Sequence, residues 1–365
     1  MSAIRIRLAE DSDNDRIIEL AKRCPQEGMI TLFINRLPRF NTLHRLLDPG
    51  SWHYVACQED RIIGLVGVIH FRARVLDRTC KMGYLMDLRV DEEFRRGLTT
   101  YRLVKAAVDH LQQSDAEMVI INIIKDNKRS IVFTSGRGGL PGAHYLGDNR
   151  IFNLLPIHRM RLNKRFSIER PSEKDIPEML ELYRKYASGF SIAPVSSEEH
   201  FRKHLDSVEG LSLDNFLLAR ENGNIKAVTA VWDEHRYLKY QVLKLNFSIR
   251  VVMAVLRFLS FFMRVPQPVR LNEPLNHLSL VLYAHDDCPE ALDTLFRKVN
   301  NDNLGTQYTM IMLYAQQNDP MFSFMKKYKG VTVISEMHLF AKDTKVFEEL
   351  RKDHTKVLLD LTMIL

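Results

Sequence analysis

The chain has 365 residues, of which 45% are hydrophobic and 27% charged, a composition that excludes collagen-like and wholly disordered proteins. At roughly 150 residues per domain, this length predicts about two domains. Lysine and arginine exceed aspartate and glutamate by 52 to 45; this net charge of +7 suits a polyanionic ligand but does not indicate nucleic acid. The four cysteines lack metal-site spacing and the N-terminus lacks a signal-peptide core, so we expect reduced thiols and a cytoplasmic location.

The first predicted elements recur later in the chain. Residues 5–24 and 167–187 each predict a short strand, an acidic cap and an amphipathic helix. Residues 52–71 and 215–233 each predict a hairpin, with matching positions 162 residues apart. Such an offset indicates duplication of a whole domain rather than a solenoid of short repeats.

A third pair of segments places an insertion in the second copy. Residues 117–133 and 308–324 each predict an apolar strand, a turn containing Asn or Asp, and a new helix, with matching positions 191 residues apart. The longer offset indicates an insertion of about 29 residues before this strand. We therefore expect one domain type used twice, over residues 1–164 and 165–365, with a helical insertion near 246–268.

Each copy is predicted to run through strand, helix, helix, hairpin, long strand, helix, strand, helix and strand. This order is α+β: a mixed, mostly antiparallel twisted sheet flanked by helices, with one parallel strand–helix–strand step. In the first copy the long helix covers residues 99–113. Its start is a natural anion site, because unpaired backbone N–H groups and the macrodipole favour a phosphate there. Arg95 and Arg96 would add charge-assisted contacts, although a solvated arginine pair explains the same pattern.

The residues around this helix start form a recognisable pattern. A strand ending in Leu88, Arg89 and Val90 is followed by a turn made of Arg95, Arg96, Gly97, Leu98, Thr99 and Thr100. The pattern resembles the GNAT superfamily of acyl-CoA-dependent N-acyltransferases, in which a turn of the form R-x-x-G-x-G/A holds the CoA pyrophosphate. One glycine of that turn is missing here. The resemblance covers both halves and implies acetyl-CoA, or another acyl-CoA, as cosubstrate, and we expect no metal.

A second element of the resemblance follows the next strand. Asn127, Ser130 and Thr134 match the spacing of the family motif N-x-x-A-x-x-L/F-Y. By resemblance Asn127 contacts the pantetheine arm, a role compatible with capping a helix. Thr134 stands where many members have the tyrosine that protonates the leaving thiolate. A water molecule, Tyr145 or Tyr101 would have to replace it.

Acyl transfer from a thioester to an amine needs a base for the amine, a stabilised carbonyl oxygen and a leaving thiolate. Backbone N–H groups beside Leu88 to Val90, splayed by a bulge, would stabilise the oxygen. Asp87 is the first candidate base, directly or through water, while an ion pair with Arg89 explains an aspartate there equally well. His70, at the end of the hairpin, is a weaker alternative.

The second copy lacks the basic turn. Asp286 and Asp287 follow its apolar strand, and two carboxylates would repel a phosphate, so we expect no CoA there.

The insertion at 246–268 is apolar nearly all round a helix, with an arginine at every seventh position: Arg250, Arg257 and Arg264. These arginines argue against a membrane span. The helix could pack on the domain pair or at a dimer interface, or lie on a membrane surface. A further hypothesis is a lid over an apolar substrate, lined by Phe258, Phe261 and Phe262.

The leading hypothesis is an N-acetyltransferase whose second half shapes the site for an amine acceptor, either a small molecule or a peptide. A homodimer is a further possibility, and neither a nucleic-acid partner nor stable membrane insertion is expected. One alternative is a non-catalytic CoA-binding or scaffold protein, favoured by the missing glycine and tyrosine. Another is an aminoacyl-tRNA-dependent transferase, which would show salt-sensitive tRNA binding.

Overall fold

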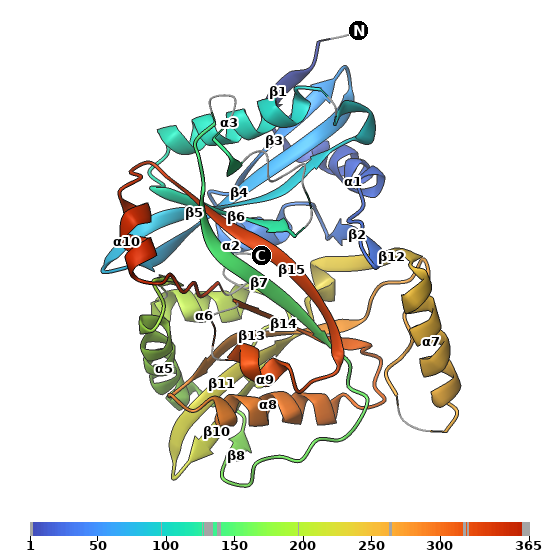
Figure 1. The fold of residues 1–365 in the computed structure, drawn as a ribbon, viewed down its shortest axis with the longest axis vertical. Helices are drawn as coiled ribbons and strands as arrows, with labels where there is room; N and C mark the ends of the chain where they lie inside the picture. The colour runs from blue at the N-terminus through green and yellow to red at the C-terminus, as the bar shows by residue number, and fades with distance from the viewer. Residues whose placement is uncertain are drawn as a thin grey trace.

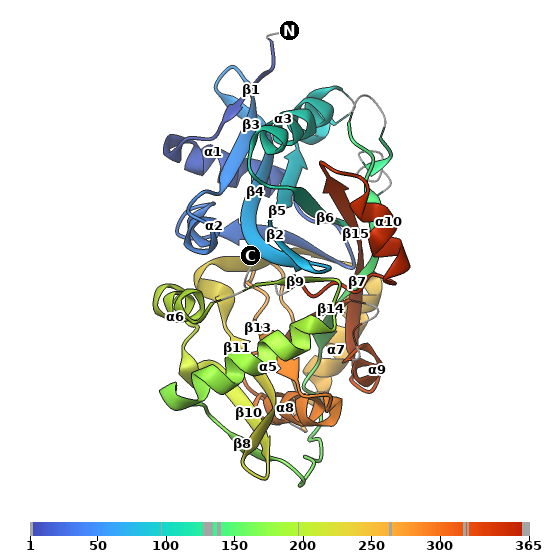
Figure 2. The same ribbon diagram turned by 90° about the vertical axis from the view of Figure 1, so that its left-hand side faces the viewer.

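The fold is built around one large sheet to which both halves of the chain contribute. The computed structural model describes residues 3–95, 97–125, 127, 134–136, 140–195, 197–262, 265–316, 319 and 321–359. Within these residues 13 strands form one sheet, and the two halves lie one above the other along it (Figures 1 and 2).

The strands of this sheet come from both copies of the predicted repeat. The first half supplies β1 (Arg5–Leu8), β3 (Trp52–Gln58), β4 (Arg61–Val75), β5 (Arg78–Val90), β6 (Met118–Ile124) and β7 (His144–Leu154). The second half supplies β8 (Ser167–Glu169), β9 (Ile192–Pro194), β10 (Phe216–Glu221), β11 (Asn224–Trp232), β13 (His277–His285), β14 (Met310–Gln316) and β15 (Gly330–Ala341). Their order is β1-β3-β4-β5-β6-β15-β7-β14-β13-β11-β10-β8, and β9 pairs with β4.

The last strand of each half lies in the sheet of the other half. β15 runs antiparallel to β6, with Ala341 opposite Met118 and Ser335 opposite Ile124. On its other side β15 pairs with β7, which pairs in turn with β14. Figure 1 shows these two long strands, green and red, running between the halves. The predicted boundary near residue 164 falls between β7 and β8.

Each half also contains one parallel pair, β5 with β6 and β13 with β14, while the other strand pairs of the sheet are antiparallel in the described residues. These are the two parallel steps that the repeated sequence predicts. The predicted fold class, α+β with two tandem, mostly antiparallel domains flanked by helices, is confirmed.

Helices cover both faces of the sheet. The first half contains α1 (Asn14–Arg23), α2 (Thr42–Leu47) and α3 (Thr99–Gln113). The second contains α5 (Ile176–Ser188), α6 (Glu198–Ser207), α7 (Phe247–Leu259), α8 (Pro289–Asp302), α9 (Met321–Met325) and α10 (Val346–Lys352). The helix predicted at 99–113 is α3, and its apolar spacing buries Leu103, Ala107 and Leu111 against the sheet. Ile17 and Leu20 of α1 are buried in a separate cluster with β3 and β4.

A second, two-stranded sheet bridges the halves. β2 (Ile30–Arg36) of the first half pairs antiparallel with β12 (Leu238–Leu245) of the second. β12 lies between β11 and β13, where the predicted insertion falls, and α7 follows it directly. The helix predicted near 246–268 is thus present but ends at Leu259.

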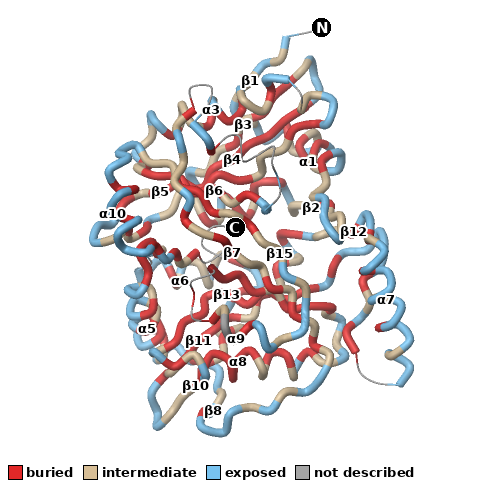
Figure 3. The backbone as a smooth tube through the Cα atoms, viewed as in Figure 1, coloured by how far each residue is buried: buried red, intermediate tan, exposed pale blue. Residues whose placement is uncertain are grey.

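The joint between the halves is apolar. Side chains from β4, β5, β6, β14, β15 and α10 form one buried cluster there, which includes Ile69, Met82, Tyr84, Ile120, Tyr314, Met337, Leu339 and Leu350. Figure 3 shows buried segments concentrated along the sheet in both halves. Because the shared cluster and the exchanged strands hold both halves, we expect the protein to unfold as one unit.

The two tryptophans allow this to be measured, since Trp52 lies in the first half and Trp232 in the second. In each of Trp52→Phe and Trp232→Phe, we expect the fluorescence of the remaining tryptophan to give the same urea midpoint as far-UV circular dichroism of that variant. Leu339→Ala, at a fully buried position of β15, should lower the free energy of unfolding by roughly 2–5 kcal/mol. Added to either variant, that substitution should lower the fluorescence and circular dichroism midpoints together, and separated midpoints within one variant would contradict a single folding unit.

Candidate active site

A bulge interrupts β5 just before the predicted CoA-binding strand motif. The ladder between β4 and β5 shifts register between Leu65 and Gly67. Asp87 and Leu88 of β5 therefore lie opposite a single residue of β4. Asp87 has a φ of 54°, in the left-handed region that residues other than glycine rarely adopt. The bulge therefore lies where the sequence predicts that the backbone binds the thioester carbonyl.

β5 and β6 separate beyond this bulge. Their parallel pairing ends at Leu85 and Ile121, although β5 continues to Val90 and β6 to Ile124. β6 stays in place because β15 pairs with its other edge up to Ile124. On the side facing β6, the last residues of β5 have no partner strand within the described part of the chain. The result is an opening in the hydrogen-bonded ladder between two fixed strands.

The turn that leads from β5 into α3 is exposed and lightly packed. Leu98, the N-cap residue of α3, makes no side-chain hydrogen bond to the helix and is 72% exposed. Gly97 is exposed too, and a Cβ added there would find its nearest atom, the Phe94 carbonyl oxygen, 3.8 Å away. Thr100 is half-buried, whereas Thr99 is buried and offers a ligand only its backbone. This helix start is open to an anion.

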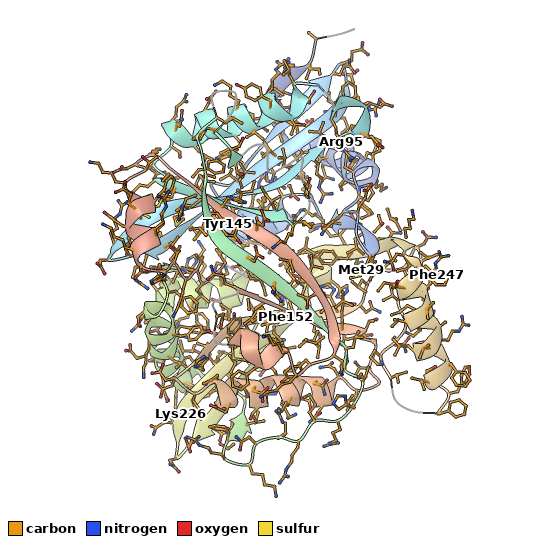
Figure 4. All side chains as sticks on the ribbon, viewed as in Figure 1. Met29, Arg95, Tyr145, Phe152, Lys226 and Phe247 are labelled. Atoms are coloured by element: carbon orange, nitrogen blue, oxygen red, sulfur yellow. The ribbon has the colours of Figure 1, made fainter. Side chains whose placement is uncertain are left out.

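The predicted arginine pair is only partly described. Arg95 Nε donates a hydrogen bond of 2.8 Å to the Val90 carbonyl oxygen, which holds the side chain against the end of β5. Figure 4 labels Arg95 in the upper part of the molecule, in the half that carries α3. Arg96 lies outside the described residues.

The predicted pantetheine motif is also only partly described. Asn127 follows β6, and its backbone N–H donates to the Ile124 carbonyl oxygen over 3.0 Å. Ser130 lies outside the described residues. Thr134 is buried, and its carbonyl oxygen accepts a hydrogen bond of 3.0 Å from the Ala143 N–H.

Two tyrosines of the first half, Tyr145 and Tyr84, differ from a free tyrosine as sources of a proton for the thiolate. Tyr145 donates its hydroxyl hydrogen to Asp148 Oδ1 over 2.5 Å. Burial and this hydrogen bond raise the pKa of Tyr145, which makes it a weaker acid. Tyr84 of β5, which the sequence does not single out, accepts a hydrogen bond of 3.3 Å from Asn122 Nδ2 of β6. Burial raises the pKa of Tyr84 as well, so neither tyrosine is activated as an acid.

Asp87 is almost fully buried, with 8% of its side chain exposed, and lies between two arginines. Arg36 Nη2 lies 2.9 Å from Asp87 Oδ2, and Arg89 Nη2 lies 3.7 Å from Oδ1. Burial alone would raise the pKa of Asp87, but the positive charges of Arg36 and Arg89 outweigh it and hold this pKa well below its ordinary range. Asp87 is therefore ionised at physiological pH, and its shorter contact is to Arg36 of β2.

Two histidines that sequence analysis missed lie beside Asp87. His44 of α2 and His53 of β3 are buried, with His44 Nδ1 3.1 Å from His53 Nε2. Burial lowers the pKa of both, that of His53 to about 4, so both rings are neutral at pH 7. His44 Nε2 has no hydrogen-bond partner among the described residues. Gly67 makes room for this pair, because a Cβ there would lie 2.4 Å from His53 Cδ2.

The same three side chains have the spacing of a metal site. Potential ligand atoms of His44, His53 and Asp87 lie within 4.8 Å of one another. Arg36 and Arg89, however, already neutralise the Asp87 carboxylate, and their charges oppose a divalent cation. The electrostatics suit proton transfer to or from a neutral group better than metal binding.

Two other predictions from the sequence concern His70 as an alternative base and the phenylalanine lid. His70 Nδ1 lies 3.0 Å from Asp48 Oδ2, so this histidine is held by Asp48. The rings of the predicted lid are 63%, 78% and 75% exposed for Phe258, Phe261 and Phe262. Because they face solvent, the hypothesis that they line a cleft near Asp87 is wrong.

The second half repeats the bulge of the first. The ladder between β11 and β13 shifts register between Val228 and Ala230, and Leu282 has a φ of 50°. Parallel pairing of β13 with β14 likewise ends before the bulge, at Leu280 and Leu313. The duplicated backbone therefore carries the same distortion twice.

The opening beyond the second bulge is closed by side chains. The Tyr283 hydroxyl lies 2.7 Å from Asp319 Oδ2 and 3.2 Å from the carbonyl oxygen of Tyr314 on β14. The Tyr186 hydroxyl donates to the other oxygen of Asp319 over 3.1 Å. In the turn that follows β13, Asp286 pairs with Lys185 and with Lys226, which offsets its charge. This turn is neutralised from within the protein and presents no free basic group to a phosphate.

The histidine pair makes stability depend on pH. Between pH 6.5 and about 4 the unfolded chain protonates His53 but the folded protein does not, so stability falls as the pH falls. We expect His53 to account for roughly 3 kcal/mol of this loss. Chemical denaturation of His53→Gln at a series of pH values should give a flatter profile. His158→Gln, at an exposed histidine, is the control, and equal slopes for all three proteins would contradict a buried neutral His53.

Comparison with known proteins agrees with this geometry. Residues 12–138 match the Acetyltransferase (GNAT) family. A protein described as "Probable N-acetyltransferase HLS1-like" from Arabidopsis thaliana is 28% identical over 141 residues, which are 38% of this chain. That match spans only 30% of the relative's length.

Two solved structures share the fold over nearly the whole chain. N-myristoyltransferase from Saccharomyces cerevisiae with bound myristoyl-CoA covers 93% of this chain and 78% of its own, with a TM-score of 0.61 and 13% identity. A GCN5-related N-acetyltransferase from Kribbella flavida covers 94% of this chain and 72% of its own, with a TM-score of 0.53 and 11% identity. At such identities these likenesses show the fold alone. Residues 12–138 thus match the GNAT family, and the chain as a whole has the fold of these N-acyltransferases.

Proposed function

We propose that the first half binds acetyl-CoA and transfers its acetyl group directly to a primary amine. One observation supports this above all: the bulge at Asp87 adjoins an opening between β5 and β6 that leads to the uncapped start of α3. The pyrophosphate would lie at this helix start, where backbone N–H groups and the macrodipole favour an anion. The pantetheine arm would follow the opening, with Asn127 at the end of β6.

The thioester carbonyl would meet the backbone at the bulge. N–H groups of Leu88 to Val90 that face the opening could donate hydrogen bonds to the carbonyl oxygen as it gains negative charge. Their strand is paired with β4 on one side, and β6 is paired with β15 on the other side of the opening. Donors held in this way need little reorganisation during the reaction, which is the basis of their catalytic value.

The amine would approach from the side of Asp87 and the histidine pair. The amine would enter as the free base, and the Asp87 carboxylate would accept its proton through water as the nitrogen attacks. Its low pKa makes it a weak base on its own. The neutral His44 ring beside it, whose Nε2 lacks a partner among the described residues, is a second proton acceptor. The negative charge of Asp87 would stabilise the imidazolium that results.

The second half would form a wall of the acceptor site. β12 pairs with β2, the strand that ends in Arg36, and brings Tyr240 opposite Ile34. Burial and then the charge of Glu234 raise the pKa of Tyr240, and the charges of Arg36 and Asp87 also act on it, which places it near the same centre. A small-molecule or peptide amine would thus contact both halves.

The substitution Gly97→Ala, which adds a single methyl group to the turn, tests CoA binding. Gly97→Ala should leave the free energy of unfolding unchanged or slightly raised, because its Cβ has open space. It should weaken acetyl-CoA binding at least about tenfold, because a Cβ blocks close approach of pyrophosphate to the backbone. Isothermal titration calorimetry measures both affinity and stoichiometry, and we expect one CoA per chain.

Gly28→Ala is the matched control, since Gly28 is equally exposed and its nearest atom to an added Cβ is the Ile30 carbonyl oxygen at 3.5 Å. Equal affinities for the two variants would contradict pyrophosphate binding at the turn. Myristoyl-CoA is titrated beside acetyl-CoA to establish the acyl-chain length. Salt-sensitive binding of tRNA without CoA binding would favour the aminoacyl-tRNA-dependent alternative.

Catalysis is tested at Asp87. With a panel of primary amines and a thiol-release assay, Asp87→Asn should lower kcat by about 100-fold or more. Its acetyl-CoA affinity, measured by the same titration, should stay unchanged, which shows that the variant is folded. His44→Gln should lower kcat and change the pH profile of the reaction. CoA binding without thiol release for any amine would favour the non-catalytic CoA-binding protein.

A further inference from the structure

Helix α7 presents an unusual apolar face to solvent. It stands at the edge of the molecule in Figure 1 and is mostly exposed in Figure 3. Four phenylalanines at and beyond its ends are largely exposed, Phe247 by 74%, Phe258 by 63%, Phe261 by 78% and Phe262 by 75%. A soluble domain rarely leaves such a cluster uncovered without a binding role.

The helix is apolar on two opposite faces. Its inner face packs against the two-stranded bridge through Ile249, Met253 and Leu256. At 100° per residue, the opposite face carries Phe247, Val251 and Phe258, and the ring of Phe262, beyond the helix end, lies 5.3 Å from that of Phe258. Arg250 and Arg257, seven residues apart and both exposed, lie on a flank between these faces. The outer face is therefore an apolar strip with a basic border.

The charge around the helix is one-sided. Residues 235–272 contain seven lysines and arginines and no aspartate or glutamate. The whole chain carries 52 basic and 45 acidic residues, so this segment accounts for the entire surplus of +7. Its described basic side chains are all exposed: Arg236, Lys239, Lys244, Arg250, Arg257 and Arg270. Arg236 and Arg270 pair with Glu209 and Glu273 outside the segment, whereas Arg250 and Arg257 of α7 form no ion pair within the described residues.

We propose that α7 docks the protein on the surface of an anionic phospholipid bilayer. The phenylalanines would enter the boundary between headgroups and acyl chains, while the arginines and lysines would contact the phosphate-bearing headgroups. A second copy of the chain fits this face less well, because two acid-free segments would bring like charges together. None of the described helices is long and apolar enough to cross a membrane, so the association is peripheral.

The full chain is tested with extruded vesicles, either of phosphatidylcholine alone or with roughly 30% phosphatidylserine added. In a flotation assay we expect binding to the anionic vesicles only, weakened by high salt. Phe258→Ser with Phe262→Ser should reduce the bound fraction at least about tenfold, because the apolar anchors are lost. Arg250→Gln with Arg257→Gln should abolish the preference for anionic vesicles.

Leu8→Ser removes an exposed apolar side chain from β1 and is the control, which should bind like the unchanged protein. Circular dichroism of each variant establishes that it is folded. Absence of binding to the anionic vesicles, or equal binding by the double phenylalanine variant, would overturn the proposal. A dimer in analytical ultracentrifugation that this double variant abolishes would assign the face to a second copy instead.

Discussion

The structure depends on the exchange of the last strands between the two halves. β6 owes its position to β15, which comes from the far end of the chain, and can therefore part from β5 without being lost from the sheet. An opening between neighbouring strands would otherwise leave an edge strand with unpaired backbone groups on both sides. The same exchange places β7 against β14, so that both halves share one sheet and one apolar joint.

The two copies share the same backbone distortion but carry different side chains beside it. Both carry a bulge with a left-handed residue, Asp87 in the first and Leu282 in the second. In the first copy the last residues of β5 have no partner strand on this side within the described residues, and an ionised carboxylate lies beside them. In the second copy Tyr283 reaches across to β14 and engages Asp319. Both copies keep the same backbone geometry, and their side chains at the bulge differ.

The sequence predicts what depends on local pattern. Apolar spacing predicts α3 to the residue, and repeat offsets predict the fold class and the position of the inserted segment. The exchanged strands could not be predicted, because apolar runs such as β6 pair equally well with any strand of matching length. His44, His53 and Arg36 carry no local motif and meet Asp87 only through tertiary packing. The roles of Asp87, the turn at Gly97 and Asn127 stay predictions.

The strand exchange also bears on how the protein is made. The partner of β6 is β15, about 200 residues later in the chain. During synthesis the first half therefore emerges with the apolar edge of β6 uncovered, and it cannot complete its sheet until residue 341 has left the ribosome. Contacts so distant in sequence close slowly, because a long loop must first be ordered. Folding of this domain pair thus waits for the synthesis of β15.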